Sequence, residues 1–135
     1  MNKRAPCGEI ITRTIAMPGD TNANGDIFGG WIMAQMDIAS GIIAKHTAKC
    51  RVATVAVDRM EFHKPVHVGD TVACYGELVK VGRTSMQIHI EVWCQRDIKD
   101  DYFIVTEAQF TYVAIDDEGR PVPVYREDNP PPVQA

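Results

Sequence analysis

The sequence predicts an α+β domain in which one antiparallel sheet of five strands curls around a single long helix. The first observation is the segment WIMAQMDIASGIIAKH at residues 31–46, which has helical length and is almost wholly apolar. Such a helix is expected to be buried on all sides. The second is a set of segments with strand-like alternation, one before this helix and four after it. A sheet curled about the helix is the arrangement that buries both.

Length and composition suit one globular domain, because 135 residues with 45% hydrophobic content can bury a core of their own. The net charge of −4 and the pI near 5.5 come without basic clustering, which argues against a nucleic-acid surface. There is no basic, apolar leader, and polar residues interrupt the longest apolar stretch. We therefore expect neither secretion nor a membrane span, and a cytoplasmic location.

The elements are expected in the order strand, helix and four strands. Residues 1–8 are predicted to form a flexible N-terminal arm, residues 9–120 the domain, and residues 121–135 a proline-rich C-terminal tail that is disordered or lies on the surface. The strands are predicted at residues 9–17, 51–62, 71–81, 84–96 and 102–115. The turns between the last four are HKPVHVGD, the Gly82 and Arg83 pair, and the acidic loop DIKDD.

Asp37 is the main candidate for a catalytic group, because it is the only charged residue between residues 27 and 44. A carboxylate on an apolar helix is costly unless it is paired or has a task. Its helical neighbours are mostly small and leave room beside it: Met33, Ala34, Ser40, Gly41 and Ala44. The alternative is that Asp37 faces solvent next to Lys45.

Gly29 and Gly30 fall at the first turn of the helix, where backbone N–H groups have no partner within the helix. Without a Cβ, they leave these donors accessible to a carbonyl oxygen that becomes negative. The charged residue nearest this end is Asp26. Asp26 is a candidate for function, and equally for an N-terminal cap or an Asx turn.

Three other types of site are not expected. The four cysteines are far apart in sequence and form no CxxC pair, so neither a zinc site nor a disulfide is predicted. His63 and His67 have a spacing that can bind a metal, but no third ligand is evident. No Gly-x-Ser-x-Gly segment or Cys/His pattern indicates a serine or cysteine hydrolase.

Three segments carry a resemblance to a known family: PGDTNANGDIFGGWIMAQMD, RVATVAVDRMEFHKPVHVGDTV and YGELVKVGRTS. They resemble the YciA-type acyl-CoA thioesterases of the hotdog superfamily, over residues 10–115. The resemblance implies a hotdog fold, hydrolysis of acyl-CoA to a fatty acid and coenzyme A, and homodimers with joined sheets that assemble further into hexamers. It implies that Asp37 is the catalytic carboxylate. Related two-domain thioesterases have an asparagine at the position of Asp26, which makes Asp26 a secondary candidate.

The expected chemistry begins with a thioester carbonyl polarised by the amides of Gly29 and Gly30. Asp37 would then take a proton from an attacking water, or attack directly to give a mixed anhydride, and both routes stay open. No cofactor is needed, since coenzyme A enters only as part of the substrate. The middle of a helix lies about 10 Å from its first turn, so we expect a site shared by two subunits.

Strand residues supply further candidates. Thr54 is predicted to share a strand face with Asp58, where it would bind the attacking water or Asp37, or only pack. For the phosphates of coenzyme A we select four cations, which are ordinary solvated charges in the alternative interpretation: Arg83, Lys64, Arg59 and Lys80. The acyl chain is expected near Met33, Met36, Met60 and Phe62, some of which would be plain core.

Two other functions remain open at this point. A hotdog dehydratase or hydratase works with a histidine near the helix start, where this chain has Phe28 and Trp31 beside the glycines. A non-catalytic module that binds acyl-CoA would be expected to carry an additional DNA-binding or partner domain, and 135 residues leave no space for one.

Overall fold

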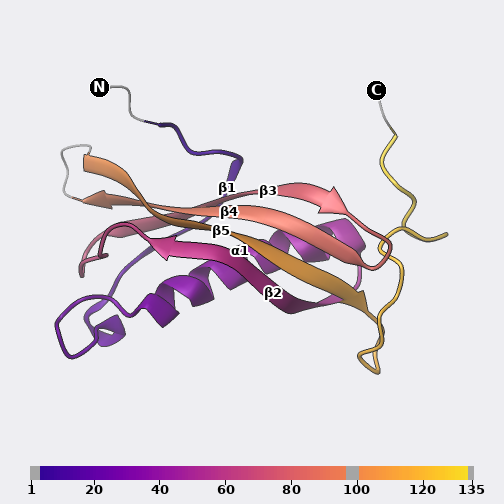
Figure 1. Ribbon diagram of the computed structural model, residues 1–135, viewed down its shortest axis with the longest axis horizontal. Helices are drawn as coiled ribbons and strands as arrows, with labels where there is room; N and C mark the ends of the chain where they lie inside the picture. Colours follow the sequence, from indigo (N-terminus) through magenta and orange to yellow (C-terminus); the bar gives the residue numbers. More distant parts are fainter. Residues whose placement is uncertain (1–3, 97–100, 134–135) are drawn as a thin grey trace.

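The computed structural model describes residues 4–96 and 101–133, so residues 97–100 of the predicted acidic loop lie outside the described residues. Five antiparallel strands form one sheet around a long helix, which confirms the predicted fold class (Figure 1). The elements are β1 (Glu9–Ile15), η1 (Pro18–Asp20), α1 (Gly29–Ala48), β2 (Arg51–Phe62), β3 (Thr71–Val81), β4 (Ser85–Arg96) and β5 (Asp101–Ile115). The predicted bounds agree within two residues, and β1 ends before residue 17 because Pro18 opens η1.

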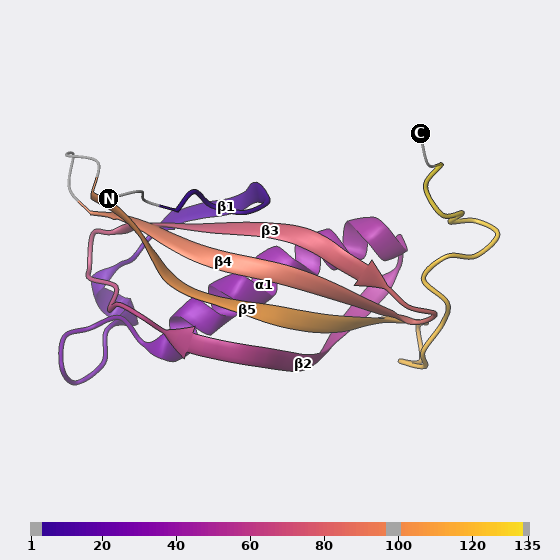
Figure 2. The same cartoon turned by 45° about the horizontal axis from the view of Figure 1, so that its top comes forward.

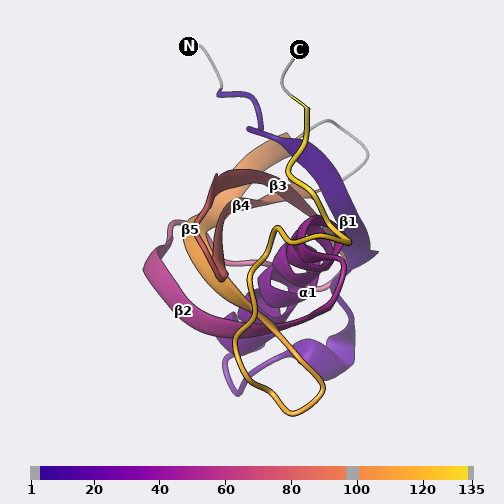
Figure 3. The same ribbon diagram turned by 90° about the vertical axis from the view of Figure 1, so that its right-hand side faces the viewer.

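The strands lie in the order β1-β3-β4-β5-β2, which is plain in Figure 2. The helix connects the two edge strands, because β1 precedes it and β2 follows it. Seen end-on, the sheet curves around α1 (Figure 3). Gly76 in β3 allows a close approach, since a Cβ there would lie 2.7 Å from the Cδ1 atom of Ile43 on the helix.

Only one side of α1 is buried in the single chain. Ile32 and Met36 lie in the core against the sheet, whereas Ile38 and Ile42 on the other side are 55% and 41% exposed. The expectation of burial all round is therefore wrong for one subunit, because the sheet wraps one side of the helix. Within the described residues, no helix has the length and hydropathy needed to cross a bilayer.

Part of the predicted C-terminal tail packs against the end of α1. The helix ends at Ala48 because Lys49 adopts a left-handed conformation, and its last carbonyls need partners outside the helix. The Asn129 amide supplies them by donating to the carbonyls of Thr47 and Ala48 at 3.0 and 3.2 Å. Val124 is fully buried in the core. The division into arm, domain and tail stays a prediction, and residues 1–3 and 134–135 lie outside the described residues.

The outer face of the sheet carries a fully buried carboxylate, Glu91 in β4. His89 Nε2 and Trp93 Nε1 donate to it at 2.8 and 2.9 Å, and the Cys7 amide donates at 3.2 Å. The guanidinium of Arg4 forms an ion pair with the same carboxylate. Burial alone would raise the pKa of Glu91, but these donors and the Arg4 charge lower it below its ordinary value. The cluster thus ties residues 4–7 of the predicted arm to the sheet.

We expect Glu91→Gln to lower the free energy of unfolding at pH 7 by roughly 1.5–3 kcal/mol, because charge-assisted hydrogen bonds are lost. Because the pKa of Glu91 is lowered in the folded state, the ionised carboxylate stabilises the fold at pH values above its ordinary pKa of 4.5. That contribution disappears as the pH falls through the lowered pKa. Chemical denaturation from pH 7 to pH 3 should therefore show the wild type and the variant converging in acid. The control is Glu107→Gln. The Glu107 side chain is 34% exposed, so this substitution should lower the free energy of unfolding by less. Equal losses of stability in the two variants would contradict the stabilising role of Glu91.

Candidate active site

Asp37 lies on α1 with its carboxylate held by two hydroxyl groups from the sheet. Thr54 of β2 donates to its Oδ1 atom at 2.7 Å. Tyr112 of β5 donates to the same Oδ1 atom and, at 2.7 Å, to the backbone carbonyl of Asp37. Asp37 itself is exposed. The structure therefore brings together two of the predicted site residues, Asp37 and Thr54, and adds a third that the sequence analysis missed.

The register of two strands explains this meeting. Thr54 and Tyr112 are directly paired across β2 and β5, so their side chains point to the same face of the sheet, toward α1. The prediction that Asp58 shares this face is wrong. The register shifts between Thr54 and Ala56, and the extra residue reverses the alternation, which pairs Asp58 with Gln109 on the outer face.

The buried Tyr112 hydroxyl acts as a donor. Burial, and next the hydrogen bond to Asp37, raise the pKa of Tyr112 far above its ordinary value, so the phenol keeps its proton. In the sequence, Tyr112 looks like any aromatic residue on an alternating strand. The distance of 75 residues that separates it from Asp37 gives no local signal of their contact.

The start of α1 opens onto a cavity of about 270 Å³ that Gly29, Phe62, His63 and Lys64 help to line. Phe28 is the N-cap residue and makes no side-chain cap, so Gly29 and Gly30 place their N–H groups in the uncapped first turn. The role of these amides as donors to a thioester oxygen stays a prediction. Within one chain, the amides and Asp37 stay about 10–12 Å apart along the helix.

Asp26 does not cap the helix, and the Asx turn is built by another residue. The Oδ1 atom of Asn22 accepts from the backbone N–H groups of Asn24 and Asp26, at 2.9 and 3.1 Å. Asn22 therefore shapes the loop that leads into α1. The two structural explanations offered for Asp26 are both wrong, and its side chain stays a secondary catalytic candidate.

The residues predicted to surround an acyl chain separate into two groups. Met36 is fully buried in the core, and Met60 packs against that core. Met33 and Phe62 are exposed, at 41% and 47%, and Phe62 lines the cavity at Gly29. Of these four residues, Met33 and Phe62 are thus the exposed ones in the single chain.

The four predicted phosphate-binding cations lie at two ends of the domain. Lys64 is beside Gly29, and its ammonium lies 5.0 Å from the centre of the Phe103 ring. Arg59 lines a neighbouring cavity with His63. Lys80 lies near the end of β3, and Arg83 lies in the turn between β3 and β4. That turn meets the C-terminal segment near the end of α1, because the carbonyl of Arg83 accepts from the Val124 amide.

The histidines lie in different parts of the fold, and no metal site at His63 and His67 is predicted. His63 and His67 line separate cavities and do not share one. His63 also lies in the cavity at Gly29, so a histidine does reach the helix start through space. Among the described residues, His89, Glu91 and Glu107 have ligand atoms within 4.8 Å of one another. The guanidinium of Arg4 binds both carboxylates, which gives this group a structural explanation.

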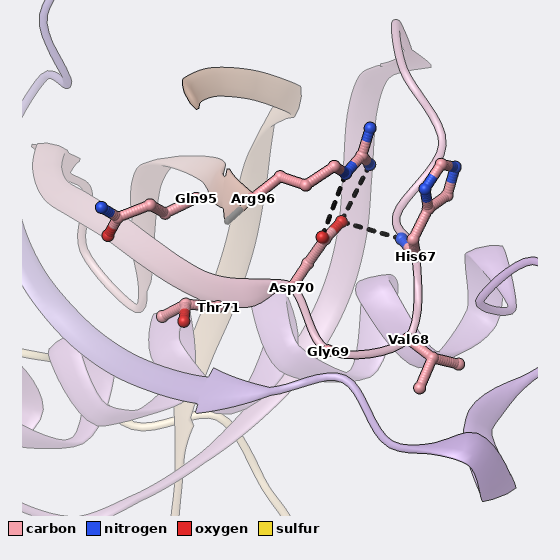
Figure 4. Close-up of a pocket in the computed structure, with 7 residues that line it drawn as sticks. All are labelled: His67, Val68, Gly69, Asp70, Thr71, Gln95 and Arg96. Carbon is pink, nitrogen blue, oxygen red and sulfur yellow. Dashed lines mark hydrogen bonds and ion pairs between the residues drawn. The ribbon is translucent and has the colours of Figure 1, made fainter. Parts of the chain in front are cut away.

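A cavity of about 690 Å³ lies away from Asp37, next to the loop before β3 (Figure 4). Its buried Asp70 accepts from Arg96 at 2.9 Å and from the His67 amide at 2.8 Å. Arg96 also donates to the carbonyl of Pro65. These contacts hold the loop against β4, so we assign the polar residues that line this cavity a structural role.

Comparison with known proteins places this geometry in context. The family model described as the thioesterase superfamily matches residues 24–99. The acyl-CoA thioester hydrolase YciA of Escherichia coli K12 is 53% identical over 119 residues, which is 86% of this chain and 90% of that protein.

Solved structures agree with this comparison. The crystal structure of HI0827, a hexameric broad specificity acyl-coenzyme A thioesterase, superposes with a TM-score of 0.88 at 52% identity, covering 93% of this chain and 87% of the other. The hexameric thioesterase y2039 of Yersinia pestis gives a TM-score of 0.85 at 55% identity, with 88% and 97% covered.

Proposed function

The chain belongs to the thioesterase superfamily, and from this premise we propose that it hydrolyses acyl-CoA thioesters to a free fatty acid and coenzyme A. The observation that carries the proposal is the Asp37 carboxylate, exposed on the helix and held at one oxygen by Thr54 and Tyr112. A fixed and accessible carboxylate is suited to general-base or nucleophilic chemistry. The relatives at about half identity carry the same activity in their names.

In the proposed reaction, the thioester carbonyl accepts hydrogen bonds from the first-turn amides of Gly29 and Gly30. Asp37 takes a proton from water as the water oxygen attacks the carbonyl carbon. The tetrahedral intermediate collapses with cleavage of the C–S bond, and the proton passes to the coenzyme A thiolate. The route through a mixed anhydride with Asp37 uses the same groups. Neither route calls for a cofactor.

We propose that the amides and Asp37 of one site come from two subunits. The exposed side of α1 and the edge strand β2 together present a large apolar surface, with Val55 56% exposed. An apolar edge strand of 12 residues is normally paired or covered. A homodimer that joins the two β2 edges would cover both features. Further assembly into a hexamer is supported by the two hexameric neighbours.

The test is incubation of the purified protein with acyl-CoAs of short to long chain, with a thiol-trapping dye and EDTA present. Release of free coenzyme A without an added cofactor is the expected result. A change in enoyl absorbance without thiol release would favour the dehydratase, to which His63 near Gly29 gives a histidine. Binding of acyl-CoA with no product would favour a binding module.

We also propose a cytoplasmic location, since Cys7, Cys50, Cys74 and Cys94 are free thiols, as in reducing compartments.

We expect Arg83→Ala to raise KM for acyl-CoA by about tenfold or more, because one charge-assisted contact to phosphate is lost. Hydrolysis of a short pantetheine thioester, which lacks the nucleotide phosphates, should stay nearly unchanged. Steady-state kinetics on both substrates measure the difference. The matched control is Arg120→Ala, whose side chain is 72% exposed in the turn after β5. Equal effects of Arg83→Ala on both substrates would remove Arg83 from the phosphate site.

A further inference from the structure

We propose that Tyr112 is a positioning residue that fixes the Asp37 carboxylate and leaves Oδ2 as the reacting oxygen. The inference rests on the proposed thioesterase function and adds to it a residue on the far strand β5. Tyr112 is 2% exposed, and its ring stacks near Phe110 with centroids 6.5 Å apart. Its position is therefore fixed by packing and not by solvent contacts.

Two contacts join Tyr112 to Asp37, and together they define the side-chain orientation. The hydroxyl lies 2.7 Å from the backbone carbonyl of Asp37, which fixes the phenol relative to the helix. The same hydroxyl binds Oδ1, which fixes the carboxylate relative to the phenol. Gly41, one turn further along the helix, lies beside the phenol. A Cβ at Gly41 would lie 3.6 Å from the hydroxyl oxygen, an ordinary van der Waals contact, so a larger side chain there would press on the phenol.

The two oxygens of the carboxylate are thereby made unequal. In the part of the chain that the structure describes, Thr54 and Tyr112 both donate to Oδ1, and neither donates to Oδ2. Because Oδ1 accepts both of these hydrogen bonds from the sheet, Oδ2 is the atom available to take a proton from water or to attack a carbonyl. A base held in one orientation needs no rearrangement during the reaction.

The experiment is Tyr112→Phe, which removes the hydroxyl and keeps the packed ring. We expect kcat to fall by about tenfold to a hundredfold, the effect of losing one hydrogen bond to a charged group, with KM changed less than about twofold. A fall in kcat at nearly constant KM is the readout of a positioning role, because the hydroxyl orients the reacting carboxylate and does not bind the substrate. A merely structural role would lower the melting temperature and leave kcat of the folded enzyme in place.

The matched control is Tyr102→Phe, which removes from the same strand a hydroxyl that donates to Tyr75 at 2.7 Å and does not touch Asp37. It should leave kcat and KM unchanged. If Tyr112→Phe fails to fold, Gly41→Val displaces the hydroxyl from the helix side and should lower kcat in the same way. An unchanged kcat in the folded Tyr112→Phe variant would overturn the inference. A wild type without thiol release would overturn the proposed function first.

Discussion

Asp37→Asn is expected to lower kcat by about a hundredfold or more while the fold and ligand binding are retained. The amide is nearly isosteric, and its oxygen can still accept the hydrogen bonds that Thr54 and Tyr112 donate to Oδ1. What the amide loses is the ability to take a proton from water or to act as a nucleophile. Steady-state kinetics and thermal melting on the same variant measure both effects.

The control for this prediction is Asp58→Asn, which neutralises an aspartate on the outer face of the same sheet. It should leave kcat unchanged. An Asp37→Asn variant with full kcat and a raised melting temperature would show that Asp37 is only a tolerated charge on an apolar helix. The catalytic role would then have to move to Asp26, or the hydrolase proposal would have to be abandoned.

The strands and the helix could be predicted because each follows a local pattern. Alternation locates residues 51–62 and 71–81 to the residue, and the apolar segment locates α1. The candidate Asp37 also follows from local composition, as a lone charge among apolar neighbours. These features need only the neighbours in sequence and the periods of strand and helix.

The rest of the site depends on tertiary contacts that no local pattern encodes. At the register shift after Thr54, β2 has one more residue than its partner β5. Asp58 therefore points to the opposite face of the sheet from Thr54. Tyr112 reaches Asp37 only because β5 lies beside β2 in the sheet order. His63 comes near Gly29 because β2 ends beside the start of α1. The exposed side of α1 has a further cause, since a helix that is apolar all round needs more than one sheet to cover it.

Gly29→Pro is expected to lower kcat by about 10²-fold to 10³-fold, because it deletes one amide donor to the thioester oxygen. Proline is tolerated at the first position of a helix, where the lost N–H has no helical partner. The preceding Phe28 has φ −56° and ψ 134°, which suits a residue before proline. Gly29→Ala is the control, since it keeps the N–H and places its Cβ 3.6 Å from Phe62, an ordinary contact. Similar losses in both variants would remove the Gly29 amide from the site.

The same variant tests whether two subunits share each site. Asp37→Asn and Gly29→Pro, produced separately, should both be nearly inactive. In a mixed dimer with a shared site, the Asp37 of one subunit meets the Gly29 of the other, so one of the two sites is intact. Co-expression in equal amounts should therefore restore about a quarter of the wild-type activity, because about half of the dimers are mixed. If each subunit held a complete site, every site would carry one defect and no activity would return. Sedimentation of the co-expressed protein should show the same oligomer as the wild type, so that a failure to recover activity counts against the shared site and not against assembly.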